Sequence, residues 1–311
     1  MALLLADTPG ALEGVEHFTR RMSGAEVNVA IGLTRLGFPV EYLTRLGDDP
    51  FGHYIEQALK DNGIGTNLLT YDPVYRTGIQ LKEYVKDGHD PAAPYYRKGS
   101  AASHLSIREI DALDLGEIGL VHVTGIPPAL SKEAREATYR LMERARKAQI
   151  LVTFDPNLRP ALWENDEMMR KVLNDLANYA DVVLPGIGEC EILAGTTDKE
   201  KAADFYHQKG AALVVIKDGK NGAYVSEKKE NGEITRDMIP GYPVKKVVDT
   251  VGAGDGFAVG VLSGLLKGLP VSECAKRGNA IGSIQVQHRG DNEGLPTEEI
   301  LQTYMVGNIQ K

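Results

Sequence analysis

Three closely spaced glycines surround one carboxylate in residues 248–260, which read VDTVGAGDGFAVG. Gly252 and Gly254 let backbone N–H groups converge on one point, and the apolar helical pattern that follows adds the donors of a helix N-terminus. Such a cradle, built from Gly252, Ala253 and Gly254, suits a phosphoryl group in transfer. Asp255 beside it is either the general base for an attacking hydroxyl or a cap of the helix. The residues alone leave both readings open.

Three polar loops follow predicted strands elsewhere in the chain. They read GIPPA at 125–129, DPNLR at 155–159 and KDGKNG at 217–222. Open α/β sheets bind ligands at the carboxyl ends of their strands. We therefore expect the three loops to share one rim.

The elements that position these loops alternate after residue 118. Apolar segments predict strands, and amphipathic segments with polar starts predict helices. This alternation predicts right-handed crossovers and a mainly parallel sheet. The predicted strands are 118–125, 150–157, 181–185 and 212–219, and the predicted helices are 131–149, 165–177, 189–193 and 199–209.

The segment 25–115 has a different pattern. Helices are predicted over 25–37 and 49–63, a strand over 40–47, and short strands over 77–88 and 93–100. The short strands alternate polar and apolar residues, so they either form a lid that stands off the main body or an edge hairpin of the main sheet.

Composition bounds the class of protein. The 311 residues suffice for one large α/β domain with an appendage, and 42% are hydrophobic. A formal net charge of −8 argues against nucleic acid as a partner. Cys190 and Cys274 share no metal-ligand spacing, so both are expected to be buried, reduced thiols of a cytoplasmic protein. We expect neither a membrane span nor a secretory signal.

Two motifs resemble the PfkB, or ribokinase-like, carbohydrate kinases. DTVGAGDGFAVGVLSGLL at 249–266 is similar to the C-terminal signature of this family, and GAEVNVAIGLTRLGFPVEYLTRLGDDPFG at 24–52 is similar to its N-terminal signature. The resemblance covers nearly the whole chain. It implies one domain over residues 1–311, a doubly wound, mainly parallel sheet with helices on both faces, and a small β-sheet lid formed by strands within about 38–46 and 74–100.

A narrower resemblance concerns the substrate. YYRKGSA at 95–101 and RGDNEGLP at 289–296 are similar to the 2-keto-3-deoxygluconate kinases of that family. A sugar acid needs cations, and the guanidinium groups of Arg97 and Arg159 match a carboxylate in geometry. Tyr95 and Tyr96 alternate along a strand, so only one faces the cleft, and the resemblance favours Tyr95. The alternative to a binding role for this segment is a solvated lid strand with one packed tyrosine.

The resemblance implies a role for each remaining residue. Asp255 is the base, beside the cradle of Gly252, Ala253 and Gly254. The sugar acid is expected to contact Gly24, Ala25, Asn28, Gln80, Tyr95, Arg97, Arg159, Asp255 and Asp291. ATP is expected to contact Asn157, Arg159, Lys217, Gly219, Gly222, Gly252, Gly254 and Asn279.

Two positions depart from the family pattern. Glu189 is retained from a water-mediated magnesium site, but Gly186 stands where many relatives carry asparagine, which puts the contact to Mg²⁺ in doubt. Relatives also begin with a strand that carries a Gly-Glu pair, so the chain is expected to lack the first strand of the sheet.

The sequence therefore predicts an ATP- and Mg²⁺-dependent kinase that phosphorylates the C6 hydroxyl of 2-keto-3-deoxygluconate. Its expected partners are the sugar acid, ATP and, through the lid, further copies of itself. The alternatives are a fructokinase, a 5-dehydro-2-deoxygluconokinase, or a sugar sensor that has kept the fold without catalysis.

Overall fold

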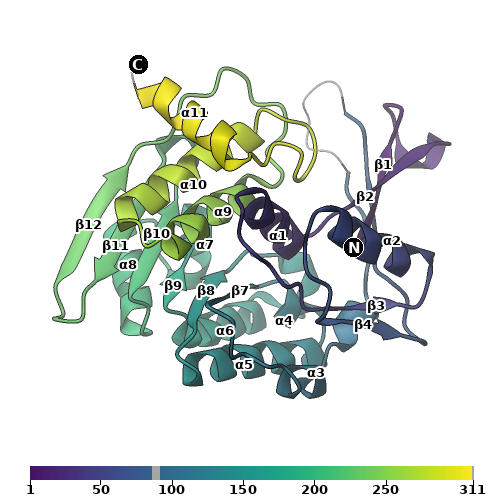
Figure 1. Cartoon of the computed structure of the whole chain (residues 1–311), viewed down its shortest axis with the longest axis horizontal. Helices are drawn as coiled ribbons and strands as arrows, with labels where there is room; N and C mark the ends of the chain where they lie inside the picture. Colours follow the sequence, from purple (N-terminus) through teal and green to yellow (C-terminus); the bar gives the residue numbers. More distant parts are fainter. Residues whose placement is uncertain (86–91, 310–311) are drawn as a thin grey trace.

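The strands predicted after residue 118 form the central sheet of the protein, and the helices between them cover one of its faces (Figure 1). The computed structural model describes residues 1–85 and 92–309. Strands β7 to β10 are parallel, and β11 and β12 continue the sheet as an antiparallel pair. The order β7-β8-β9-β10-β11-β12 follows the chain without reversal, with bounds Leu120–Thr124, Leu151–Asp155, Val182–Val183, Leu213–Lys217, Ala223–Lys228 and Ile234–Ile239.

Both faces of this sheet are buried, so its central strands are apolar on each side. In β10, Val214 and Ile216 pack against one layer of helices, whereas Leu213 and Val215 pack against the other. The first layer contains the crossover helices α4 Pro127–Leu130, α5 Lys132–Lys147, α6 Asp166–Leu176, α7 Ile187–Ala194 and α8 Lys199–Gln208. The second contains α1 Ala25–Arg35, α9 Ala253–Leu266, α10 Val271–Gln285 and α11 Glu298–Ile309.

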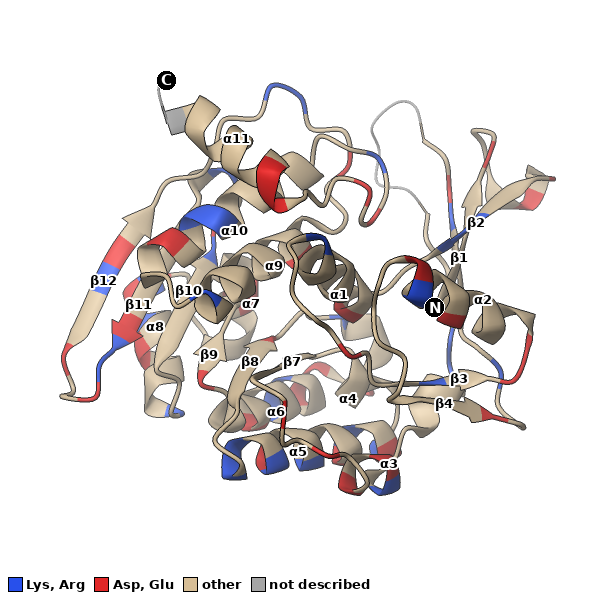
Figure 2. Ribbon diagram, viewed as in Figure 1, with Lys and Arg blue, Asp and Glu red and all other residues tan. Residues whose placement is uncertain are grey.

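Side-chain caps begin several of these helices where the sequence predicted. Ser131 Oγ accepts the N–H of Ala134 at 3.0 Å at the start of α5, and Asn165 caps α6 in the same way. The outer surfaces of α5 and α3 (Ile107–Asp111) carry both acidic and basic residues (Figure 2). Apolar side chains of α5 face the sheet, as its amphipathic pattern requires.

A separate small sheet stands beside the main body (Figure 1). We call it the small sheet, with strand order β2-β1-β5-β6 and bounds Phe18–Met22, Ala2–Ala6, Ile79–Lys82 and Tyr95–Tyr96. The hairpin-like strands β5 and β6 thus belong to this sheet, which excludes the alternative that they extend the main sheet. The end of the strand predicted over 77–88 lies at residues 86–88, outside the described residues.

Two predictions about the lid strands need correction. The strand predicted over 40–47 is shorter, β3 Thr44–Gly47, and it pairs in parallel with β4 Leu69–Asp72 in a sheet of its own. The strands that join β5 and β6 in the small sheet are instead β1 and β2, which were not predicted to belong to the lid. Helix α2, Pro50–Asp61, follows β3 directly and begins at the Asp49 cap.

Two further expectations can be compared with the structure. Cys190 and Cys274 are both buried and free, as predicted. In the part of the chain that is described, no helix combines the length and apolarity needed to cross a membrane.

Candidate active site

Asp255 lies in the first turn of α9 but does not cap it. The helix begins after Gly252, and its first N–H groups receive no side-chain cap. The carboxylate of Asp255 instead accepts a hydrogen bond from Asn28 Nδ2 at 2.8 Å and a long one from Asn157 Nδ2 at 3.5 Å. The structure therefore overturns the capping interpretation and leaves the helix N-terminus open to an anion.

The surroundings of Asp255 favour a proton acceptor of increased basicity. Burial raises the pKa of Asp255 above its usual range, while the hydrogen bond from Asn28 opposes this change. The charge of Glu26 raises the pKa further, and Lys217 and Arg159 lower it. A carboxylate whose pKa is moved towards neutrality is suited to general-base catalysis.

Gly252 is required by both its backbone conformation and its surroundings. Its φ is +77°, and a Cβ atom there would lie 2.1 Å from the carbonyl oxygen of Asp291. The turn is therefore pressed against the loop that carries a predicted substrate-binding residue. Any side chain at this position would push the two apart.

We expect Gly252→Ala to lower the free energy of unfolding by about 3 kcal/mol, because a positive φ and a backbone clash act together. Gly219→Ala is the matched control, since Gly219 has φ +53° with nothing within 4 Å of the added Cβ. Its cost should be about 1 kcal/mol. Urea denaturation of both variants measures the difference, and equal costs would show that the contact with Asp291 is easily relieved.

A lysine from another strand supplies the cation that the glycine-rich segment lacks. Lys217 ends β10, and its Nζ lies 3.9 Å from the position of a Cβ on Gly254. It also contacts Asp155 Oδ2 at 2.6 Å. Burial lowers the pKa of Lys217, but Asp155, Glu189 and Asp255 together outweigh this effect and hold the pKa above its usual value. Lys217 therefore stays charged beside the cradle, as a phosphate site requires.

Asn157 occupies the loop between Asp155 and Arg159 with φ +40°. Asparagine tolerates this left-handed conformation better than most residues. Its backbone N–H donates to Asp155 Oδ1 at 3.2 Å, which turns the loop towards Asp255. Arg159, farther along, is exposed and donates to the carbonyl of Leu158 at 2.7 Å.

Glu189 has a structural task in addition to its predicted one. Its Oε2 accepts the N–H of Gly186 at 2.6 Å at the start of α7, and its Oε1 accepts the N–H of Leu158 at 2.9 Å. It thereby ties α7 to the DPNLR loop. Among residues 1–85 and 92–309, no three His, Cys, Asp or Glu side chains form a group that could hold a metal. The contact of Glu189 with magnesium stays a prediction.

Arg97 brings a buried guanidinium from the small sheet. Arg97 is 8% exposed, and its Nε has no hydrogen-bond partner among the described residues. The guanidinium lies 4.3 Å from the ring centroid of Tyr95 and contacts Met1 Sδ at 3.8 Å. Burial lowers the pKa of Arg97, the charges of Tyr95 and Glu26 raise it, and the charge of Arg159 lowers it. Arg159 is therefore close enough to repel Arg97.

The other predicted residues of the small sheet share one face. The register places Gln80 beside Tyr95, and strand alternation puts Lys82 on the same side. Ser23 Oγ lies 3.3 Å from Gln80 Oε1 and 2.5 Å from Asp291 Oδ2, so it links both to the end of β2. This face is therefore directed towards the loop of Asp291, and Tyr95, not Tyr96, lies on it.

The N-terminal motif contributes the first turn of α1. Gly24 precedes the helix, Ala25 begins it, and the buried Asn28 lies one turn on. Asn28 Oδ1 accepts a hydrogen bond from Asn292 Nδ2 at 3.1 Å, while its Nδ2 reaches Asp255. The N-terminal and C-terminal motifs thus meet at the carboxylate of Asp255.

Two residues that were predicted to contact the nucleotide are engaged in contacts within the protein. Asn279 Nδ2 donates to the carbonyls of Ile239 and Pro240 at 3.1 and 3.0 Å, which fixes the end of β12. At Gly222, a Cβ would lie 2.0 Å from the carbonyl oxygen of Ile239. Both residues shape the strand ends near Lys217, and their contact with ATP stays a prediction.

Three polar residues that lie in or beside this site were not predicted from the sequence: Asp155, Lys82 and Glu26. Asp155 opens the DPNLR motif, so its place at a strand end was a usable signal. Lys82 is two residues after Gln80, and strand alternation alone puts it on the same face. Glu26 contacts Thr124 on β7, a pairing that no local pattern predicts.

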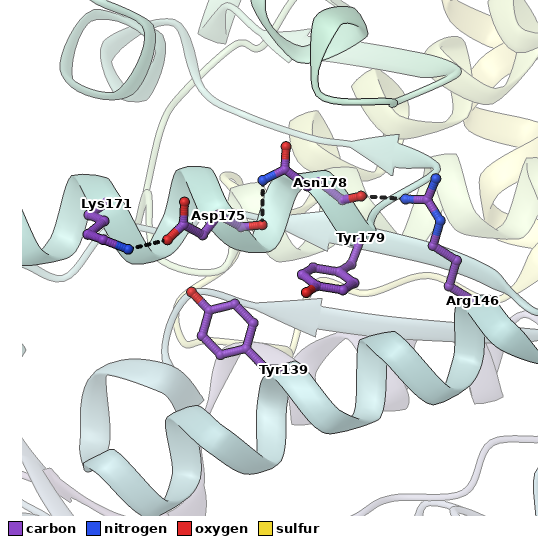
Figure 3. Close-up of a pocket in the computed structure, with 6 residues that line it drawn as sticks. All are labelled: Tyr139, Arg146, Lys171, Asp175, Asn178 and Tyr179. Carbon is purple, nitrogen blue, oxygen red and sulfur yellow. Dashed lines mark hydrogen bonds and ion pairs between the residues drawn. The ribbon is translucent and has the colours of Figure 1, made fainter.

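A cavity of about 620 Å³ lies elsewhere, between α5 and α6 (Figure 3). The charged groups drawn there are engaged: Lys171 pairs with Asp175 at 2.6 Å, and Arg146 donates to the carbonyl of Asn178. None of the predicted site residues lines it. The chemistry of the chain therefore gathers at the glycine-rich turn and not in this cavity.

Comparison with known proteins accords with this site. Residues 4–298 match the family described as pfkB family carbohydrate kinase. The chain is 46% identical to the 2-dehydro-3-deoxygluconokinase of Bacillus subtilis (strain 168), over 98% of this chain and 93% of the relative. It also superposes on a PfkB protein from Polaromonas sp. JS666 with a TM-score of 0.87, at 46% identity over 97% and 96% of the two chains.

A more distant relative has been solved with ligands bound. The fructokinase from Vibrio cholerae O395, in a form bound to fructose, ADP and calcium ion, has a TM-score of 0.83 at 26% identity and covers 98% of this chain and 96% of its own. The chain belongs to the pfkB family of carbohydrate kinases, and its ribokinase-like fold is confirmed. It is a phosphotransferase that acts on a sugar.

Proposed function

We propose that the protein transfers the γ-phosphoryl group of ATP to the C6 hydroxyl of 2-keto-3-deoxygluconate, giving 2-keto-3-deoxy-6-phosphogluconate and ADP. The observation that carries this proposal is Arg97, a buried guanidinium whose Nε has no hydrogen-bond partner in the described residues. A buried guanidinium whose Nε–H has no partner is costly, so an anionic ligand would complete the site. A neutral hexose offers no such group.

The positions of the two arginines fit a carboxylate between them. Arg97 comes from the small sheet and Arg159 from the rim of the main sheet, and the charge of Arg159 lowers the pKa of Arg97. A carboxylate would turn their repulsion into two charge-assisted contacts. Tyr95 would stack beside Arg97 and hold it in place.

The rest of the sugar acid would face hydrogen-bonding groups. Gly24 and Ala25 would approach it closely, and Asn28, Gln80 and Asp291 would bind its hydroxyls. Asp291 already accepts hydrogen bonds from Ser23 and Lys82, so its carboxylate is held in one orientation. A fixed acceptor selects the position of a hydroxyl better than a mobile one.

Asp255 would take the proton of the C6 hydroxyl. The hydroxyl oxygen then forms its bond to the γ-phosphorus, and the bond from that phosphorus to the β-phosphate oxygen breaks, releasing ADP. Backbone N–H groups of Gly252, Ala253 and Gly254 would bind the charge on the phosphoryl group, with Lys217 beside them. Removal of the proton by a positioned base is the step that this chain provides.

ATP would lie along the strand ends from Asn157 and Arg159 to Lys217, Gly219, Gly222 and Asn279. Magnesium, when bound, neutralises phosphate charge and is held largely by phosphate oxygens and water. The carboxylates near the cradle fit this arrangement, because Asp155 is engaged by Lys217 and Glu189 by backbone N–H groups. Glu189 would act on magnesium through water.

The small sheet would close over the sugar acid as a lid and exclude water. Its outward face carries Tyr96, which is 63% exposed, and such a surface suits association with another copy. We place the enzyme in the cytoplasm as a homo-oligomer joined through this sheet.

A coupled assay of ADP release tests the assignment. We expect kcat/KM for 2-keto-3-deoxygluconate to exceed that for fructose and for 5-dehydro-2-deoxygluconate by at least tenfold. Fructose has no carboxylate, and 5-dehydro-2-deoxygluconate has its keto and deoxy carbons at other positions of the chain that Asn28, Gln80 and Asp291 would bind. A higher value for either rival would reassign the substrate. Absence of ADP release with every sugar, when the protein still binds them in calorimetry, would favour a sensor.

A further inference from the structure

Lys82 is a buried cation that contacts Asp291 from the small sheet. It lies on β5 of the small sheet, and its side chain is only 6% exposed. Its Nζ contacts Asp291 Oδ1 at 3.0 Å and Asp249 Oδ2 at 3.1 Å. One ammonium group thus joins the small sheet to two segments of the main body.

Each of the two carboxylates is bound to a segment that shapes the glycine-rich turn. Asp249 Oδ1 accepts the N–H of Val251 at 3.0 Å, just before Gly252, and its Oδ2 also accepts the N–H of Gly290 at 3.3 Å. The backbone carbonyl of Asp291 occupies the place where Gly252 would carry a Cβ. Displacement of either carboxylate would therefore move the cradle.

Opposite charges hold this bridge together. Two carboxylates face one ammonium at the wall of a cavity of about 490 Å³. Burial lowers the pKa of Lys82, but Asp291 and Asp249 outweigh burial and hold the pKa above its usual value. Without the ammonium, two like charges would share a poorly hydrated site and separate.

Other basic groups line the same cavity. Arg289 lies 3.7 Å from the ring centroid of Tyr84, and Arg21 and Lys246 also line the wall. Lys82 differs because it alone of these four basic side chains contacts both Asp249 and Asp291. It is therefore the member that connects β5 to the turn.

We propose that Lys82 is a positioning residue, which locks the small sheet to the glycine-rich turn through Asp249 and Asp291 and so couples closure over the sugar to the geometry of phosphoryl transfer. The proposal rests on the kinase activity of the family and not on which sugar is phosphorylated. When the bridge is formed, the cradle and the covering sheet are in place together. When it is broken, ATP can still bind, but water reaches the phosphoryl group.

The experiment compares Lys82→Met with Lys98→Met, which removes an exposed charge from the same region. Both variants are assayed with Mg-ATP and either 2-keto-3-deoxygluconate or fructose, and ADP and phosphorylated sugar are measured separately. We expect Lys82→Met to lower kcat about 10²-fold with either sugar, the scale of a small misplacement of reacting groups, with KM for ATP changed less than threefold. ADP released per sugar phosphorylated should rise severalfold. Lys98→Met should match the wild type.

Lys82→Arg and Asp249→Asn keep the test decisive if Lys82→Met folds poorly. Arginine retains the charge and should recover at least part of the lost kcat, whereas Asp249→Asn should reproduce both the loss and the excess ADP. Hydrogen exchange of the β5 amides, measured with the non-hydrolysable analogue AMP-PNP and no sugar, should increase in Lys82→Met and Asp249→Asn. A lower thermal midpoint with unchanged kcat, ADP ratio and β5 exchange would overturn the proposal and leave Lys82 a purely structural residue.

Because fructose and the exchange measurement are included, failure of the sugar-acid assignment alone would not affect this result. A protein that phosphorylates only fructose, yet shows excess ADP in Lys82→Met, would retain the role of Lys82 and lose the proposed substrate. The reverse outcome, a sugar-acid kinase indifferent to Lys82→Met, would retain the substrate and reject the bridge.

Discussion

Asp255→Asn will lower kcat by about 10²–10⁴-fold, because an amide of the same shape cannot accept the proton of the sugar hydroxyl. Binding should survive, since the amide oxygen can still accept the 2.8 Å hydrogen bond from Asn28, and only the long 3.5 Å contact with Asn157 is lost. Isothermal titration with the sugar acid and with AMP-PNP measures binding, and product formation measures turnover. Asp237→Asn, an exposed acid on β12, is the control.

The pH profile provides a second readout of the same residue. Asp255 must be ionised to act, so wild-type kcat/KM should fall as the pH falls through its pKa, which burial raises. This acid limb should vanish from the residual activity of Asp255→Asn. Because the folded-state pKa is raised, the ionised form costs stability at neutral pH, and the variant should unfold at the same temperature or higher. Near-wild-type turnover would assign proton removal to another group.

Arg97→Leu will lower kcat/KM for 2-keto-3-deoxygluconate by about 10²-fold or more, the scale of losing a buried hydrogen bond between charged groups. Fructose has no carboxylate, so any residual activity on it should fall far less. Leucine fills part of the buried space without leaving a polar group unpaired. The measurement is kcat/KM for both sugars with both proteins.

Lys98→Leu is the matched control for Arg97→Leu, because it removes a neighbouring charge that is exposed. It should leave both values near those of the wild type. Equal losses on the two sugars in Arg97→Leu would mean that Arg97 does not recognise the carboxylate. The sugar-acid assignment would then lose its main physical support.

Local patterns predicted the parts of the fold whose contacts are local. The strands that became β7, β8, β9 and β10 and the helices between them each follow a period that the sequence displays, and each packs against its neighbour in the chain. Ala2–Ala6 shows no such pattern, and its partner β5 is more than 70 residues away. No local signal could assign it to the small sheet.

The same distinction applies to the site. The motif around Asp255 and the arginines could be named from the sequence, because their residue types and resemblance specify a chemistry. The contacts of Lys82 with Asp249 and Asp291 span sequence separations of 167 and 209. Such contacts depend on the packed structure and could not be predicted from the neighbours of each residue.

The sequential strand order has a consequence for the order in which the protein forms during synthesis. Strands β7 to β12 and helices α4 to α8 come from one continuous stretch, residues 120–239, so this half can assemble through short-range contacts while the chain is still emerging from the ribosome. Its other face waits for α9, α10 and α11. Because Asn28 and Asp255 are 227 residues apart, we expect the growing chain to become an enzyme only after its last helices dock, with an apolar surface in need of chaperone protection until then.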